Sequence, residues 1–122
     1  MSTPLLKLSP AGLFCPKGEF FVDPHQPVDR AIITHAHADH ARKGSRRYLT
    51  AAQGRGILAT RLGPRASIET LEYGESLTIN GVKVSLHPAG HILGSSQVRI
   101  ESQGEVWVVS GDYKVIPDQT CT

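Results

Sequence analysis

The feature that most constrains this chain is a run of six residues that contains three histidines and one aspartate. These side chains are His35, His37, Asp39 and His40, and a single residue, Thr34, separates the run from the apolar residues 31–33. Imidazole nitrogens and carboxylate oxygens are the usual nitrogen and oxygen ligands of zinc and related divalent ions. Four such groups beside a buried strand predict a metal site. The alternative is a polar loop whose histidines cap the end of the strand.

The spacing of these residues predicts how they are shared between ions. Alternate side chains of an extended segment lie on one face, so His35 and His37 are expected to leave the strand together and to bind one ion. A turn of the backbone near Ala38 would direct Asp39 and His40 towards a second ion beside the first.

Two further candidate ligands follow later strands. His91 lies in a glycine-flanked loop, and Asp112 follows the apolar residues 105–109. The first ion is expected to take His35, His37 and His91, and the second Asp39, His40 and Asp112, with Asp112 bridging the two. Such a pair, about 3.5 to 4 Å apart, lowers the pKa of a water towards ~7 and clamps the attacking and leaving oxygens of a phosphodiester. Asp39 is also expected to orient that water.

Four cationic residues follow the histidine run. They are Arg42, Lys43, Arg46 and Arg47. Arginine offers a bidentate fork and lysine a point charge to a phosphate, so this segment is expected to bind an anionic substrate beside the metals. A solvated turn is the alternative.

The remaining pattern predicts short strands and one helix. Hairpins are expected at residues 13–22, 77–86 and 97–109, the second of them around the turn-forming pair Asn80-Gly81. Single strands are expected at 28–34, 48–50 and 67–71. A helix is expected from Ala51 to about Leu62, with Thr50 as its cap, Gly63 as its stop and an apolar stripe on one side. That stripe consists of Ala52, Ile57, Leu58 and Leu62.

Length and composition are those of one small globular domain. The 122 residues carry a net charge of +2, and the mildly basic pI of about 8.7 permits an anionic substrate. The two cysteines, Cys15 and Cys121, lack the spacing of a thiolate metal site and are expected to be free thiols. Neither a secretory leader nor a membrane-length apolar run is evident, so a cytoplasmic location without membrane contact is expected.

Taken together, the motifs resemble those of the metallo-β-lactamase superfamily. The matching segments are the histidine run at 35–40, residues 90–95 around His91, and residues 110–114 around Asp112. The resemblance implies an α/β fold, the four-layer αββα sandwich, with two divalent metal ions, expected to be zinc. Residues 1–122 would supply only the N-terminal part of that domain.

The details resemble one branch of the superfamily. Thioesterases tend to have threonine where this chain has Ile92, whereas the segments around His91 and Asp112 are similar to the β-CASP nucleases. Residues 11–13, 20–24 and 27–40 look most similar to the bacterial ligase-associated DNA exonucleases. The inserted β-CASP domain and the downstream motifs of those proteins are absent after Asp112, so a fragment that is inactive alone is one expectation.

The resemblance implies a metal-dependent hydrolase, a nuclease that cleaves phosphodiester bonds. We expect a DNA exonuclease linked to DNA repair or ligation, with nucleic acid as substrate and a DNA ligase as a possible partner. An endonuclease that processes RNA 3′ ends and a thioester hydrolase with the same metal centre are the alternatives, together with a metal-binding fragment without activity.

Overall fold

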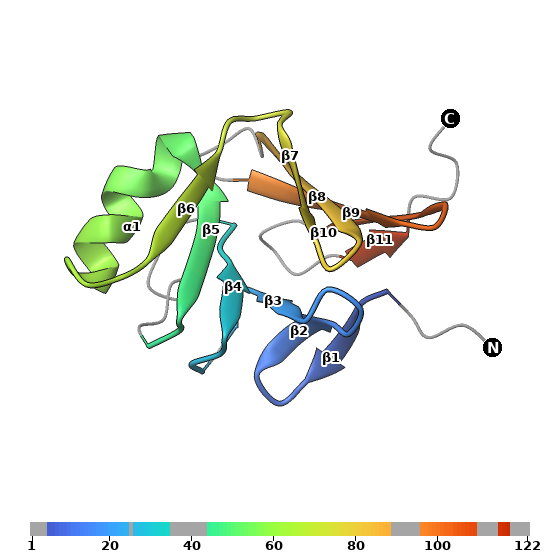
Figure 1. Cartoon of the computed structure of the whole chain (residues 1–122), viewed down its shortest axis with the longest axis horizontal. Helices are drawn as coiled ribbons and strands as arrows, with labels where there is room; N and C mark the ends of the chain where they lie inside the picture. Colours follow the sequence, from blue (N-terminus) through green and yellow to red (C-terminus); the bar gives the residue numbers. More distant parts are fainter. Residues whose placement is uncertain (1–4, 25, 35–43, 89–95, 110–114, 118–122) are drawn as a thin grey trace.

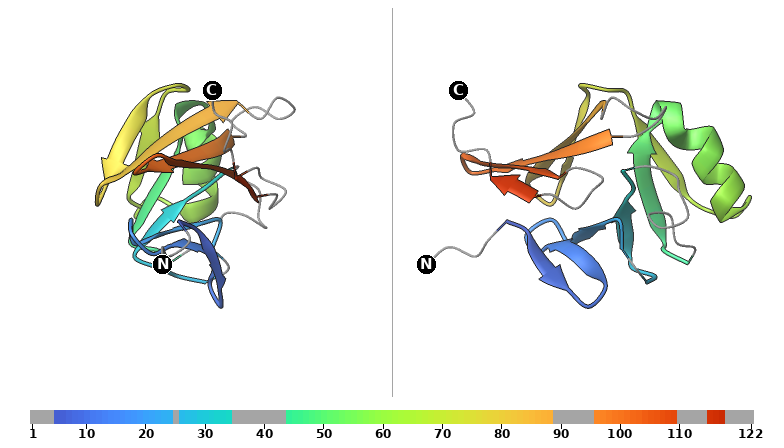
Figure 2. Two further views of the ribbon diagram at one scale, coloured as in Figure 1. Left: turned by 90° about the vertical axis from the view of Figure 1, so that its right-hand side faces the viewer. Right: turned by 180° about the vertical axis from the view of Figure 1, so that it is seen from behind.

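Two β-sheets face each other, and one helix covers the outer side of the first sheet. The computed structural model describes residues 5–24, 26–34, 44–88, 96–109 and 115–117. Figure 1 shows the N-terminal half of the chain in one sheet and the C-terminal half in the other, and Figure 2 shows the same two layers from the side and from behind. The described residues therefore form three layers, in the order helix, sheet, sheet.

The first sheet has six strands in sequence order. They are β1 (Lys7–Ser9), β2 (Gly12–Cys15), β3 (Phe20–Val22), β4 (Arg30–Ile32), β5 (Arg47–Ala51) and β6 (Ile68–Leu71). The first three strands pair antiparallel, while β3 to β6 pair parallel. Parallel neighbours place their carboxyl ends at one edge, so β4 and β5 end side by side.

The second sheet is a five-stranded antiparallel meander. Its strands are β7 (Ser76–Ile79), β8 (Val82–Pro88), β9 (Ser96–Ser102), β10 (Glu105–Val109) and β11 (Val115–Pro117), in the order β11-β10-β9-β8-β7. Asn80 and Gly81 both have positive φ, 50° and 82°, as the expected two-residue turn requires. Gln103 and Gly104 turn the next hairpin in the same way, with φ of 50° and 84°. Both predicted hairpins are confirmed.

The core lies between the two sheets. Alternate residues of the strands meet there, among them Val22, Ile32 and Leu49 from the first sheet and Leu86 and Val109 from the second. A smaller cluster joins the helix to the outer side of β4 and β5. It consists of Ala31, Ile33, Tyr48, Leu58 and Leu62. Strands β4 and β5 are therefore covered on both faces, by the second sheet on one side and by α1 on the other.

The helix begins later than its sequence predicts. Residues Ala52–Gly54 form a 3-10 turn (η1), and α1 spans Arg55–Leu62 with Gly63 as its C-cap at φ 92°. Thr50 does not cap the helix, because it belongs to β5 and its buried hydroxyl donates to the carbonyl oxygen of Ile33 at 3.3 Å. Of the predicted stripe, Leu58 and Leu62 are buried, but Ile57 is 47% exposed.

The other sequence expectations differ from the structure mainly in length. The hairpin at 13–22 and the strands at 48–50 and 67–71 are present, while the strand expected at 28–34 is confined to Arg30–Ile32. Strands β1 and β11 were not expected, and each has only three residues. Cys15 is free and fully buried, and burial raises the pKa of its thiol above the ordinary value of a cysteine. Cys121 lies outside the described residues.

Candidate metal centre

The predicted metal ligands lie outside the described residues. The segment 35–43 contains His35, His37, Asp39, His40, Arg42 and Lys43, while His91 lies in 89–95 and Asp112 in 110–114. The structure does describe the strand ends from which these three segments leave. These ends show how far the fold brings the predicted ligands together.

Strands β8 and β10 deliver two of these segments to the same edge of the second sheet. Both strands run antiparallel to β9, and therefore parallel to each other in direction. Their final residues pair with the beginning of β9, Pro88 with Ser96 and Val109 with Val98. Two strand spacings separate β8 from β10, so the segments of His91 and Asp112 leave this edge about 10 Å apart.

Strand β4 delivers the histidine run from the first sheet. Ile32 at the end of β4, Leu86 near the end of β8 and Val109 at the end of β10 belong to the same buried cluster. All three predicted ligand segments therefore follow strands whose last residues pack into one core. A core of this kind holds a strand end in place, which is what a metal site on the following loops requires.

The end of β4 is further fixed by a buried carboxylate. Asp23 is 1% exposed and Thr34 is 0% exposed. The backbone N–H of Thr34 donates to Oδ1 of Asp23 at 2.9 Å, and the Thr34 hydroxyl donates to Oδ2 at 2.6 Å. The N–H of Asp23 in turn donates to the carbonyl oxygen of Ile32 at 2.9 Å. This carboxylate therefore positions the residue directly before His35.

Asp23 directly follows the hairpin expected at 13–22, and the sequence pattern alone did not indicate its role. Asp23 has φ 46°, a conformation that aspartate and asparagine tolerate better than most residues. The sequence signal is an aspartate directly after strand β3 together with a threonine after the parallel neighbour β4, because these two positions meet at the same sheet edge.

A polar contact also occurs at the end of β8. The Ser85 hydroxyl and Nε2 of His87 lie 2.9 Å apart, and Ser85 is 5% exposed. His87 stands next to last in its strand and precedes the segment of His91 by two residues. The structure therefore gives His87 a serine partner within its own strand.

The two described cations of the predicted substrate-binding set lie at the opposite end of the parallel strands. Arg47 begins β5 and pairs with Arg30, the first residue of β4. Arg46 makes an ion pair with Asp29 at 3.4 Å, in which both side chains are at least 70% exposed. Four residues of strand separate Arg30 from Thr34, a distance of about 13 Å. The fold therefore does not bring Arg46 and Arg47 to the strand end that precedes His35.

The donor set fits a divalent ion by its chemistry. The three segments offer four imidazoles and two carboxylates, which are nitrogen and oxygen ligands suited to zinc and other first-row metals. Among the residues that the structure describes, no three His, Cys, Asp or Glu side chains are grouped closely enough to hold an ion. In this same part of the chain, no helix is long and apolar enough to cross a membrane.

Relatives in sequence are nucleic-acid enzymes by name. A probable DNA ligase of Opitutus terrae is 34% identical over 108 residues, which cover 85% of this chain and 10% of that protein. Ribonuclease TTHA0252 of Thermus thermophilus is 29% identical over 131 residues, 81% of this chain and 30% of that protein. Endoribonuclease YSH1 of Yarrowia lipolytica is 41% identical over 46 residues, 38% of this chain and 6% of that protein. The chain thus spans a third or less of these relatives.

Solved structures share the fold at low sequence identity. No protein-family model matches the sequence. The metallo-β-lactamase fold protein YhfI of Bacillus subtilis aligns with a TM-score of 0.60 at 12% identity, over 81% of this chain and 52% of that one. A variant of the β-hydroxylase CmlA, an enzyme of Streptomyces venezuelae, aligns with a TM-score of 0.61 at 20% identity, over 93% of this chain and 31% of that one.

The expected αββα sandwich is therefore confirmed for the layers that the described residues form. The helix and two facing sheets account for three layers of the αββα sandwich. The fold neighbours and the sequence relatives together support one assignment. The chain is therefore metallo-β-lactamase/β-CASP-like, with part of the metallo-β-lactamase fold in the residues that the structure describes.

Proposed function

We propose that this chain carries the metal-binding residues of a nuclease that hydrolyses phosphodiester bonds, and that the enzyme is a DNA exonuclease of DNA repair or ligation. The observation that carries the proposal is the placement of three strand ends. Strands β4, β8 and β10 pack into one core, and each is followed by a segment with predicted ligands. The names of the sequence relatives support a nucleic-acid substrate.

Two zinc ions are the proposed cofactors. His35, His37 and His91 would hold one ion, and Asp39, His40 and Asp112 the other, with Asp112 shared. The description of the fold neighbour CmlA as a diiron enzyme supports a two-metal centre without favouring zinc. When bound, the ions would supply Lewis-acid chemistry, acidifying a water and neutralising charge on the phosphate.

The residues of the chain would then position the reaction. Asp39 would orient the attacking water, whose oxygen forms a new bond to phosphorus as the bond from phosphorus to the leaving oxygen breaks. The water gives up one proton, and the leaving oxygen gains one. Arg42 and Lys43 adjoin the histidine run in sequence, which supports a role for them in holding substrate phosphates.

An RNA endonuclease is the second candidate. Two of the three relatives are named as ribonucleases, and the local match to the yeast endoribonuclease reaches 41% identity. The DNA assignment rests on the match to a probable DNA ligase, which extends over a larger share of this chain. That same relative supports a DNA ligase as partner, and a cytoplasmic location is part of the proposal.

The test combines metal binding with cleavage. The 122-residue chain is titrated with Zn²⁺ in a calorimeter and incubated with end-labelled single-stranded DNA and RNA of one sequence. We expect two ions per chain and stepwise shortening of DNA. His37→Ala and Asp112→Ala should lose metal and activity together, whereas His25→Ala, outside the predicted ligand set, should keep both.

Each other outcome contradicts a stated part of the proposal. Cleavage that persists after metal is lost would exclude the metal mechanism. Internal cuts in RNA would favour the endonuclease, and metal binding without any cleavage would mean that this chain is not active by itself.

A further inference from the structure

The segment 44–68, which contains β5 and α1 and is named the helix layer, carries an unusual excess of positive charge. Residues 44–68 include five arginines and neither aspartate nor glutamate, although the whole chain has a net charge of only +2. The five side chains are Arg46, Arg47, Arg55, Arg61 and Arg65, and all are exposed. Five positive charges without an acidic residue among them create a local field even in a near-neutral chain.

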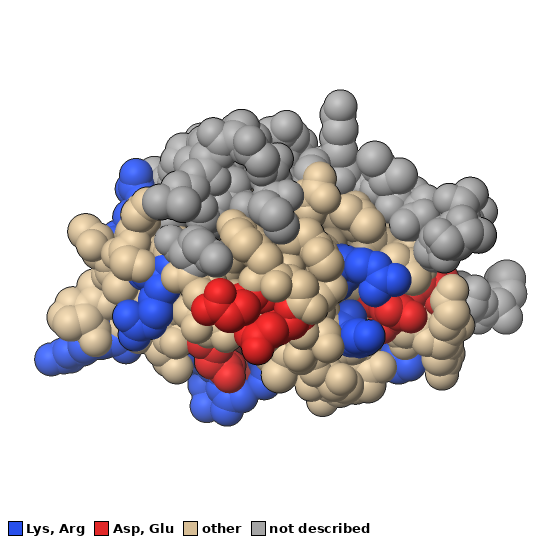
Figure 3. Space-filling model, turned by 90° about the horizontal axis from the view of Figure 1, so that it is seen from above, with Lys and Arg blue, Asp and Glu red and all other residues tan. Residues whose placement is uncertain are grey.

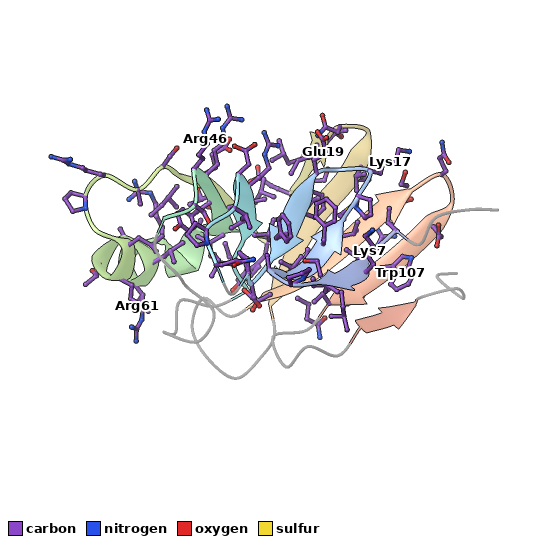
Figure 4. All side chains as sticks on the ribbon, turned by 90° about the horizontal axis from the view of Figure 1, so that it is seen from below. Lys7, Lys17, Glu19, Arg46, Arg61 and Trp107 are labelled. Atoms are coloured by element: carbon purple, nitrogen blue, oxygen red, sulfur yellow. The ribbon has the colours of Figure 1, made fainter. Side chains whose placement is uncertain are left out.

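The fold gathers these arginines around one end of the molecule. Figure 4 shows Arg46 and Arg61 on opposite sides of the end formed by α1, far from Trp107 in the second sheet. Seen from above, blue side chains border this end, while the acidic side chains lie nearer the middle of the face (Figure 3). Among the described acidic residues, Asp29 makes an ion pair with Arg46 at 3.4 Å, with both side chains largely in solvent.

A hollow lies within this basic end. Its volume is about 210 Å³, and it lies between the segment before β5 and the segment after α1. Its lining combines the apolar residues Leu62 and Ala66 with Tyr48 and the polar residues Ser45 and Arg65. The hollow is smaller than the ~300 Å³ at which small-molecule sites begin. It suits one unit of a polymer better than a whole independent ligand.

We propose that the helix layer is a binding surface for single-stranded nucleic acid, separate from the metal centre. Arg46, Arg47 and Arg65 bind successive phosphates around the hollow, and the hollow receives one base or sugar of the strand. The surface lies at the opposite end of β4 and β5 from Thr34. It therefore holds the strand at a distance from the residues before His35.

The chemistry favours nucleic acid over other anionic partners. All five cations of this layer are arginines, whose planar forks match phosphate oxygens in bidentate contacts. The hollow beside Arg65 has both apolar and polar walls, which suits an inserted base with its flat faces and polar edges. The inference rests on the proposed nucleic-acid substrate and adds a second place at which that substrate is held.

The experiment measures binding without cleavage. Fluorescence anisotropy of a labelled dT 20-mer is followed in EDTA, across a series of salt concentrations, with the complete 122-residue chain. The triple variant Arg46→Gln, Arg47→Gln, Arg65→Gln should bind ~10-fold or more weakly at low salt, and its salt slope should fall by about 2, at roughly 0.7 per lost phosphate contact. Ala66→Leu, which narrows the hollow, should weaken binding while keeping the slope.

A second triple variant provides a matched control. Lys7→Gln, Lys83→Gln and Arg99→Gln remove the same charge from other elements, and they include one ion-paired arginine, as the test set does. This control should keep the wild-type slope. Equal losses in both triples would overturn the proposal, because the effect would then follow net charge alone.

The remaining outcomes are also decisive. Absence of DNA and RNA binding by the wild-type chain, or binding of polyglutamate as tight as that of the oligonucleotide, would overturn the proposal. Since binding is measured in EDTA, a chain that binds but does not cleave contradicts the proposed activity and leaves this surface intact. Thermal unfolding of every variant checks that the fold is kept.

Discussion

The two ends of the parallel strands β4 and β5 differ in almost every physical respect. At the carboxyl end, Asp23, Thr34 and Thr50 are all 0 to 1% exposed and hydrogen-bonded to one another or to the backbone. At the amino end, Asp29 and Arg46 form an ion pair whose side chains are 70 and 77% exposed. One end is a buried network of short bonds, while the other is a solvated charge pair.

The buried end is suited to holding the backbone in place, whereas the solvated end is suited to attracting a charged ligand. A buried hydrogen bond is costly to break because its donor and acceptor would be left without water as an alternative partner. It therefore fixes the backbone that carries the next residue. A solvated ion pair contributes ~0 to 1 kcal/mol and leaves its charges available to a ligand. The carboxyl end suits the approach to a metal centre, and the amino end suits a nucleic-acid surface.

Replacement of Asp23 should have the largest effect on this comparison. Asp23→Ala removes both acceptors of Thr34 and places alanine at φ 46°, so we expect a loss of about 4 kcal/mol in urea unfolding. Asp23→Asn keeps one acceptor oxygen and tolerates this φ, so it should lose about half as much. Zn²⁺ affinity should fall in the same order, because the segment of His35 begins at this network. Equal stability of both variants would contradict the role given to the carboxylate.

Removal of the two buried hydroxyls should have intermediate effects. Thr34→Val removes the 2.6 Å bond to Asp23, and we expect it to cost about 2 kcal/mol. Thr50→Val removes a longer bond, 3.3 Å, to a neutral carbonyl, and about 1 kcal/mol is expected. Valine keeps the volume and the β-branch of threonine, so unfolding in urea reports the hydroxyl alone. If Thr50→Val were the more damaging change, the Asp23 contact would not be the main tie at this end.

Changes at the amino end should have the smallest effect on stability. Asp29→Asn breaks the exposed pair with Arg46, and the unfolding free energy should change by less than about 0.5 kcal/mol, with the difference vanishing at 1 M salt. The same change frees the Arg46 guanidinium for phosphate, so affinity for the dT 20-mer should rise slightly. A large loss of stability would mean that both ends of the strands are structural.

The sequence predicted most strands because their local signals agree with the fold. Asn80-Gly81 fixes a hairpin whose alternation of apolar and polar residues matches its pairing, and both hairpins of the second sheet are present as expected. The start of the helix was placed too early because Thr50 has the residue type of a cap. Pairing of β5 with both β4 and β6 overrides that preference and extends the strand to Ala51.

The residues of the candidate site could be predicted from the sequence, but the hydrogen bonds that hold the preceding strand end could not. Residue types and spacing indicated a metal site at 35–40, His91 and Asp112, and the described strand ends lead into those segments. Asp23 was missed because eleven residues separate it from Thr34, and only the parallel pairing of β3 with β4 brings them together. Arg46 and Arg47 are near the histidine run in sequence, yet β5 pairs parallel to β4, so both arginines lie at the opposite end of these strands from Thr34.

The sequence by itself determined the predicted metal ligands, the turns and the apolar alternation of the strands, because these depend on side-chain chemistry and on neighbours along the chain. The tertiary structure decided which ends of the strands meet. Strand direction brings the carboxyl ends of β8 and β10 to one edge, joins Asp23 to Thr34, and places Arg46 at the opposite end of the parallel strands from Thr34. Those relations depend on which strands pair and in which direction, and the paired strands can be far apart in the sequence.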